Sequence, residues 1–154
     1  MADLGSDRLL RFTTIAMIVT DIGFIIYWLL ISGHVLPAEA MFDEYTDPRV
    51  AAWNWSFLPL DVAASLTGFA AVRVMRREEP AAPALLSLSL ALTAAAGGMG
   101  AIYFALRGQF DPSWMLPNLA LLLFPLPLLT RLVRTGHVGP PSSASPAASP
   151  RGGR

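Results

Sequence analysis

Four long apolar segments constrain the fold of this chain more than any other feature of its sequence. They run roughly over Leu9–Ser32, Val50–Met75, Ala84–Leu106 and Ser113–Val133. Each reaches the length of about 20 residues that an α-helix needs to cross the hydrocarbon core of a bilayer. Little sequence is left for a separate soluble domain. We therefore predict an all-α fold, a four-helix transmembrane bundle that is a multi-pass protein of the cell membrane.

The composition agrees with a membrane protein and excludes several other classes. Of the 154 residues, 54% are hydrophobic and 14% are charged, whereas a soluble domain has about a quarter charged residues. The 11 basic residues are all arginine and are balanced by 11 acidic ones, so the chain lacks the basic field that binding of nucleic acid requires. Cysteine is absent, which excludes thiolate metal sites and cysteine nucleophiles. With no histidine cluster either, we expect no metal and no cofactor.

The arginines predict the orientation of the bundle. Positively charged residues flank membrane spans mainly on the cytoplasmic side. Nine arginines fall on the side of the two termini, and only Arg49 and Arg107 fall on the other. We therefore expect both termini in the cytoplasm and the acidic loop between Gly33 and Arg49 outside.

The domain organisation follows from the same segments. Residues 1–137 are predicted to form a single four-span membrane domain. Residues 138–154 are rich in proline, serine, alanine and glycine and cannot bury a core, so we expect a disordered tail. Asp47-Pro48 and Asp111-Pro112 each place a capping carboxylate before a proline, which predicts two helix starts.

Two acidic residues lie at the depth where a charged side chain in a membrane helix costs the most free energy. Asp21 is 12 residues from Gly33, at the outer end of the first span, and Asp61 is 11 residues from Val50, at the outer end of the second. At about 1.5 Å per residue, both fall near the middle of the bilayer on antiparallel neighbours. An ionised aspartate there costs on the order of 3 kcal/mol, and no arginine lies at that depth. We therefore expect the two carboxyls to face each other inside the bundle, with a shared proton or one neutral acid at pH 7.

Helical spacing identifies the side chains that would surround these acids. Positions three, four or seven residues from each acid lie on the same helix face. They include Trp28 near Asp21, and Asn54 and Ser65 near Asp61. Polar or aromatic groups of the third and fourth spans would complete the site. The candidate ligand-binding residues are Asp21, Asp61, Asn54, Trp28, Ser65, Asn118 and Tyr103, and the candidate catalytic residues are Asp21 and Asp61.

A purely structural interpretation of the same residues stays open. A protonated aspartate can link two membrane helices through a hydrogen bond. The small residues between Ala94 and Ala101 are typical of close helix packing.

Two segments resemble the YvaD-like family of small bacterial four-helix membrane proteins. They are Asp21-Ile-Gly-Phe-Ile-Ile-Tyr-Trp28 and Trp53-Asn-Trp-Ser-Phe-Leu-Pro-Leu-Asp61, and the similarity extends to Ser113-Trp-Met-Leu-Pro-Asn118. It covers Thr20 to roughly Arg134. The resemblance implies a four-helix integral membrane protein and no particular activity.

A weaker architectural likeness is to the emopamil-binding and sigma-2 group of four-helix proteins. Asp21, Asp47-Pro48, Trp53, Ser56-Phe57 and Asp61 stand in places similar to that group's motif residues. The second-span acid is aspartate here where that group often has glutamate. The likeness implies sterol or amine binding and, in some members, sterol double-bond isomerisation, as an analogy of architecture only.

The sequence leaves three functions open. The first is a binding protein that encloses an apolar or cationic amphiphilic ligand, such as a membrane lipid, around the acid pair. The second is an enzyme, an isomerase or cyclase in which one acid protonates an isoprenoid or sterol-like lipid and the other stabilises the cation or removes a proton. The third is proton-coupled transport by a homo-oligomer.

Overall fold

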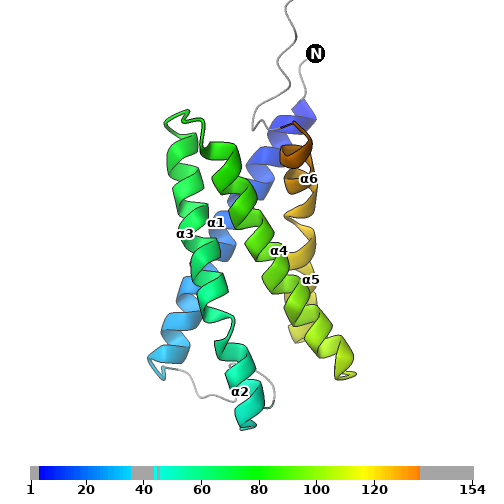
Figure 1. Cartoon of the computed structure of the whole chain (residues 1–154). Helices are drawn as coiled ribbons and strands as arrows, with labels where there is room; N and C mark the ends of the chain where they lie inside the picture. The colour runs from blue at the N-terminus through cyan, green and yellow to red at the C-terminus, as the bar shows by residue number, and fades with distance from the viewer. Residues whose placement is uncertain (1–3, 36–43, 45, 136–154) are drawn as a thin grey trace, which may run out of the picture.

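Six helices make up the part of the chain that the structure, a computed structural model, describes (Figure 1). The described residues are 4–35, 44 and 46–135. The predicted tail and most of the predicted acidic loop therefore lie outside the described residues. The helices are α1 (Leu4–Ser32), α2 (Pro48–Trp55), α3 (Leu58–Met75), α4 (Ala82–Leu106), α5 (Pro112–Leu123) and α6 (Leu126–Thr135).

These helices make four segments that are long and apolar enough to cross a membrane. The segments are Arg8–Ser32, Pro48–Met75, Ala82–Leu106 and Pro112–Thr135. The prediction of an all-α chain with four membrane-length spans is confirmed. Two of the spans differ from the continuous helices that we expected, because α2 and α3 form one span and α5 and α6 form another.

Prolines explain both interruptions. Proline has no N–H to donate, and its ring clashes with the carbonyl four residues earlier. Pro59 stands in the first turn of α3, so the helix breaks at Ser56 and Phe57. Pro125 and Pro127 end α5 and restart the chain as α6.

Aspartate N-caps begin α2 and α5, as predicted. The Asp47 carboxylate accepts a hydrogen bond of 2.8 Å from the Arg49 amide, and that of Asp111 accepts one of 2.8 Å from the Ser113 amide. Hydrogen bonds from the Ser113 hydroxyl and amide hold the pKa of Asp111 below its usual range. The cap is therefore charged at neutral pH, as the positive end of a helix favours.

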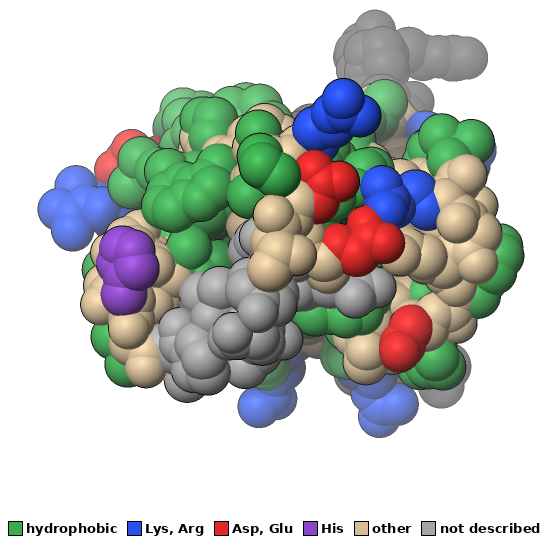
Figure 2. Space-filling view, turned by 90° about the horizontal axis from the view of Figure 1, so that it is seen from below, with side chains coloured by type: hydrophobic (Ala, Val, Ile, Leu, Met, Phe, Trp, Pro, Cys, Tyr) green, Lys and Arg blue, Asp and Glu red, His purple; other side chains and the backbone are tan. Residues whose placement is uncertain are grey.

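The bundle has two chemically different ends. The end with the α3–α4 turn and the last turn of α6 also holds the first turns of α1 (Figure 1). We call it the basic end, because seven described arginines lie on the first turns of α1, around the end of α3 and on α6: Arg8, Arg11, Arg73, Arg76, Arg77, Arg131 and Arg134. At the opposite end, which we call the acidic end, acidic and arginine side chains lie among hydrophobic ones (Figure 2). Glu44 there pairs with Arg107.

Helix α4 is the centre of the bundle. It packs against α3, α5 and α6, while α1 packs mainly against α3 and touches α6. Toward the acidic end, α1 and α5 diverge to opposite sides of the molecule (Figure 1). A Cβ on Gly97 would overlap the backbone of α5 at Asn118 and Leu122, so the small residues of α4 permit close packing, as predicted.

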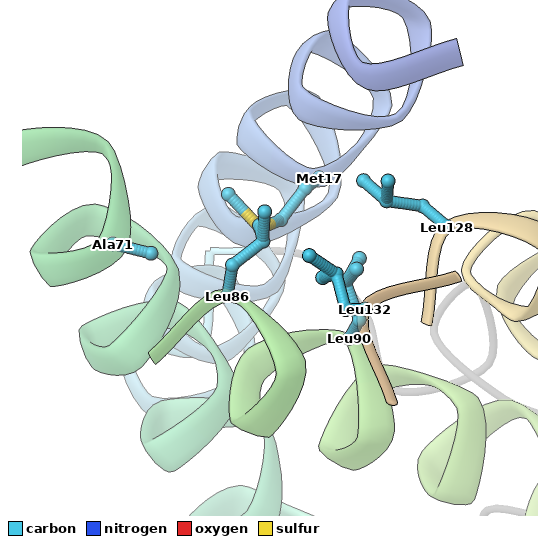
Figure 3. Close-up of a cluster of buried hydrophobic side chains, with 6 residues drawn as sticks. All are labelled: Met17, Ala71, Leu86, Leu90, Leu128 and Leu132. Atoms are coloured by element: carbon cyan, nitrogen blue, oxygen red, sulfur yellow. The ribbon is translucent and has the colours of Figure 1, made fainter. Parts of the chain in front are cut away.

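An aliphatic cluster joins all four spans toward the basic end (Figure 3). Its buried members are Met17 of α1, Ala71 of α3, Leu86 and Leu90 of α4, and Leu128 and Leu132 of α6. In lipid, the cluster gains little from leaving water, because lipid tails are as apolar as leucine. Dispersion contacts between closely packed atoms therefore stabilise this end of the bundle.

This packing predicts a difference between two leucines of α4. Leu86 is fully buried and Leu88 is 47% exposed. Leu86→Ala leaves a void of about 80 Å³, which costs about 2 kcal/mol at roughly 24 cal/mol per Å³. Leu88→Ala leaves no void, because lipid fills the space. Thermal unfolding in detergent should show a clearly lower Tm for Leu86→Ala only, and equal losses would contradict the cluster.

Candidate functional site

A cavity of about 310 Å³ lies in the half of the bundle toward the acidic end. Helix α1 forms one wall, α4 and α5 form the other, and the junction of α2 and α3 lies between them. Aromatic rings dominate the lining: Phe24, Tyr27, Trp28, Trp53, Phe57, Phe104 and Trp114. The cavity occupies the space that the divergence of α1 from α5 leaves.

Asp61 is the acidic residue of this cavity. Its Oδ2 atom accepts a hydrogen bond of 2.9 Å from the indole Nε1 of Trp28. Its Oδ1 atom is buried and has no hydrogen-bond partner among the described residues. The break before Pro59 places Asp61 in the first turn of α3, where the positive end of the helix dipole favours a carboxylate. The sequence alone placed it inside a continuous helix.

Asn54 lies beside Asp61 in the cavity wall. Its Oδ1 atom accepts a hydrogen bond of 2.9 Å from the Tyr27 hydroxyl, which links α2 to α1. Its Nδ2 atom is buried without a partner in the described part of the chain. The wall therefore holds one free acceptor, on Asp61, and one free amide donor.

The opposite wall contains Asn118. Its Nδ2 atom donates a hydrogen bond of 2.8 Å to the backbone carbonyl of Trp114. Its amide oxygen lies against Gly100, where a Cβ would overlap it. The Asn118 side chain therefore lies between α4 and α5. Its amide nitrogen is hydrogen-bonded to its own helix, and the glycine at position 100 leaves room for its oxygen.

Asp21 does not line the cavity. Its carboxyl lies over Gly68 of α3, where a Cβ would overlap Oδ2, and the Ser89 hydroxyl of α4 is next to the same point. Both Asp21 oxygens are buried and without a hydrogen-bond partner among the described residues. The two carboxyls therefore do not face each other and share no proton through a direct hydrogen bond, contrary to our expectation, whereas the alternative of one neutral acid at pH 7 stays a prediction.

The direction of side chains on antiparallel helices explains this separation. Each Cα–Cβ bond tilts toward the N-terminus of its own helix. The backbones of Asp21 and Asp61 do lie side by side, since the Ser65 hydroxyl is within hydrogen-bond distance of both carbonyl oxygens, 3.2 Å from that of Asp21 and 2.9 Å from that of Asp61. From this shared level, the Asp61 side chain leans toward the acidic end and the Asp21 side chain toward the basic end.

The structure thus brings together four of the seven predicted site residues. Trp28, Asn54, Asp61 and Asn118 line the cavity. Ser65 bridges backbones behind it. The ring of Tyr103 stacks on Trp53 with centroids 3.6 Å apart, outside the lining, and the Arg107 guanidinium lies 5.4 Å from the Tyr103 centroid.

Part of the aromatic lining was not predicted from the sequence. Phe104 belongs with Ala96 and Gly100, since these residues recur every fourth position on one face of α4. That spacing would have revealed the face. Phe24 lies three residues after Asp21, so spacing placed it on the same face of α1 as Asp21. Its position across the cavity from α5 depends on the divergence of the helices and had no sequence signal.

The chemistry of the cavity favours a positively charged guest. Asp61 supplies a buried carboxylate oxygen that has no hydrogen-bond partner among the described residues, and the aromatic faces carry negative electrostatic potential. The described lining residues include no arginine or histidine. The arrangement can therefore hold an organic cation, and it offers an anion no positive charge.

The contact between Asp21 and Gly68 gives a stability prediction. Gly68→Ala should cost about 1–3 kcal/mol, because its Cβ overlaps the buried carboxyl. Gly23→Ala is the matched control, since a Cβ there meets nothing within 4 Å. Combining Gly68→Ala with Asp21→Ala should cost less than the sum of the two single changes. Strict additivity in unfolding measurements would show that the carboxyl does not lie over Gly68.

Comparisons with known proteins identify the family. A model of a family of unknown function, DUF5360, matches residues 13–138. The uncharacterized protein YvaD of Bacillus subtilis (strain 168) is 34% identical over 128 residues, which are 83% of this chain and 96% of that protein. No solved structure matches the chain. The chain therefore belongs to the YvaD-like family of unknown function, as the resemblance of its first two spans indicated.

Proposed function

We propose that this membrane protein binds a hydrophobic organic cation, an ammonium group on an apolar body, in the cavity around Asp61. The observation that carries the proposal is the free Oδ1 atom of Asp61, buried among aromatic rings. An ammonium or quaternary ammonium group would neutralise the charge of this carboxylate and contact the faces of the rings. Asp61 is the anchor, and Asp21 takes no part in binding.

The energetics favour a charged guest over an empty charged cavity. An ionised aspartate inside a membrane costs on the order of 3 kcal/mol. The hydrogen bond from Trp28 and the first turn of α3 offset part of that cost. A cation over desolvated aromatic faces adds about 2 kcal/mol. The charge of Asp61 is therefore compensated most fully when a cation lies beside it.

The size of the cavity limits what it encloses. Its volume of about 310 Å³ corresponds to about ten water molecules at roughly 30 Å³ each. That space takes a head group and the first carbons of a chain. Phe24 of α1 and Leu121 of α5 line it from opposite sides, so the rest of an alkyl tail would leave between these helices into the lipid.

The orientation and location belong to the same proposal. The excess of arginine at the basic end supports a multi-pass protein of the cell membrane with both termini in the cytoplasm. The cavity would then lie in the outer half of the bilayer. Ligands would enter from the outer leaflet.

The other two functions find less support in the geometry. Acid–base isomerisation of an isoprenoid or sterol-like lipid needs a second group within reach of the substrate, and Asp21 points away from the cavity. Proton-coupled transport by a homo-oligomer needs a polar path along the bundle, and the aliphatic cluster of Figure 3 closes the basic half of the described structure. Binding requires neither feature.

Binding of decyltrimethylammonium to the protein in phosphatidylcholine nanodiscs tests the proposal. Emission of the cavity tryptophans, Trp28, Trp53 and Trp114, reports binding. Asp61→Asn should weaken the affinity at least about tenfold, because an opposite charge at close range contributes a few kcal/mol even when partly screened. Decyldimethylamine N-oxide, which has a similar shape and no net charge, should bind both proteins within about twofold.

Asp21→Asn provides the matched control. It makes the same chemical change at a buried aspartate of the same bundle, outside the cavity lining. We expect wild-type affinity for the cation. Equal losses in both variants, or equal affinity of wild-type protein for the cation and the N-oxide, would refute the proposed role of Asp61.

A further inference from the structure

A second hollow, independent of the cavity, lies at the basic end between α1 and α3. It has a volume of about 420 Å³ and is lined by Ile18, Phe69, Val72, Arg73, Arg76 and Arg77. We call it the arginine groove. Asp61 stands in the first turn of α3 and Arg73 in the last. The 12 intervening steps place the groove about 18 Å from the cavity along the helix.

The charges of the groove are only partly compensated within the protein. Arg77 lies 3.7 Å from the Glu79 carboxylate, and both side chains are well exposed. Arg73 and Arg76 are exposed and have no acidic partner in the described part of the chain. Two guanidinium groups are therefore left for an external anion.

The pattern along α3 combines apolar and basic contacts on one face. Phe69 and Arg73 are four residues apart in α3 and share that face. Arg76, the C-cap, and Arg77 follow in the turn after Met75 and line the same hollow. Phe69 is 40% exposed. The face is apolar toward the middle of the span and becomes basic at its end, over about one helical turn.

The helix dipole explains only part of this arrangement. Arginine near the C-terminus of a helix interacts favourably with the exposed carbonyls there. That interaction accounts for basic residues after Val72. It does not explain why they surround a hollow whose remaining lining, Ile18, Phe69 and Val72, is apolar. Arginine binds phosphate with two parallel hydrogen bonds, and basic pockets between membrane helices are typical sites for anionic lipid head groups.

We infer that the arginine groove binds one anionic phospholipid, with its phosphate at Arg73 and Arg76 and an acyl chain along Ile18, Phe69 and Val72. The charge complementarity selects an anionic head group. The apolar lining selects a lipid over a free phosphate ion. This site is separate from the proposed cation site and does not depend on it.

Native mass spectrometry of the detergent-solubilised protein, titrated with phosphatidylglycerol or with phosphatidylcholine of the same chains, tests the inference. The wild-type protein should bind phosphatidylglycerol more tightly. Each arginine near a head group contributes about fivefold to affinity, so Arg73→Gln with Arg76→Gln should weaken binding of phosphatidylglycerol about thirtyfold. Binding of phosphatidylcholine, in which choline offsets the charge of the phosphate, should weaken much less.

The control removes the same charge from the same end. Arg8→Gln with Arg134→Gln changes two exposed arginines that do not line the groove, and it should keep the wild-type affinity for phosphatidylglycerol. Equal losses in both double variants would show diffuse attraction and overturn the site. So would displacement of the lipid by equimolar glycerol phosphate, which carries the phosphate without the chains. The Arg73→Gln single variant, with an expected loss of about fivefold, repeats the test if the double variant does not fold.

Discussion

The break in the second span is the constraint on which the rest of the site depends. A proline inside a membrane helix leaves a carbonyl without its donor, and hydrocarbon offers no water to replace it. Pro59 ends α2 early and restarts the chain as α3. Because of this restart, Asp61 lies in the first turn of a helix and beside the indole of Trp28, although it is still in the middle of the span. A residue that is costly in a continuous helix thus gains a favourable electrostatic position.

The same antiparallel arrangement gives the two buried acids different environments. Asp61 faces an aromatic cavity, and Asp21 lies in close packing against Gly68 and near the Ser89 hydroxyl. The Asp21 carboxyl is packed between α3 and α4 without a hydrogen-bond partner among the described residues, so the hydrogen-bonded link between helices that the sequence left open is not seen there. The bundle therefore has a tightly packed half toward the basic end and a more open half toward the acidic end.

The sequence predicted the architecture well, because bilayer thickness sets the length of each span. It also predicted both aspartate caps and the close packing of α4, which depend on neighbours along the chain or on the absence of side chains. The relation of Asp21 to Asp61 was predicted at the level of the backbone only. Counting residues along a helix gives the depth of each acid in the bilayer. The two depths agree, since the Ser65 hydroxyl contacts the backbone carbonyls of both acids. The direction of each side chain depends instead on the polarity of its helix. The divergence of α1 from α5 depends on the packing of all four spans, so spacing within one span gave the face of Phe24 but not its position opposite α5.

The most direct test of the central claim compares the accessibility of positions 61 and 21. The chain has no cysteine, so the Asp61→Cys and Asp21→Cys variants each present a single thiol. A small cationic methanethiosulfonate reagent, applied to the protein in phosphatidylcholine nanodiscs, should label Asp61→Cys rapidly through the cavity and leave Asp21→Cys unlabelled until the protein unfolds. Similar labelling rates at the two positions, or faster labelling of Asp21→Cys, would contradict the separation of the two acids.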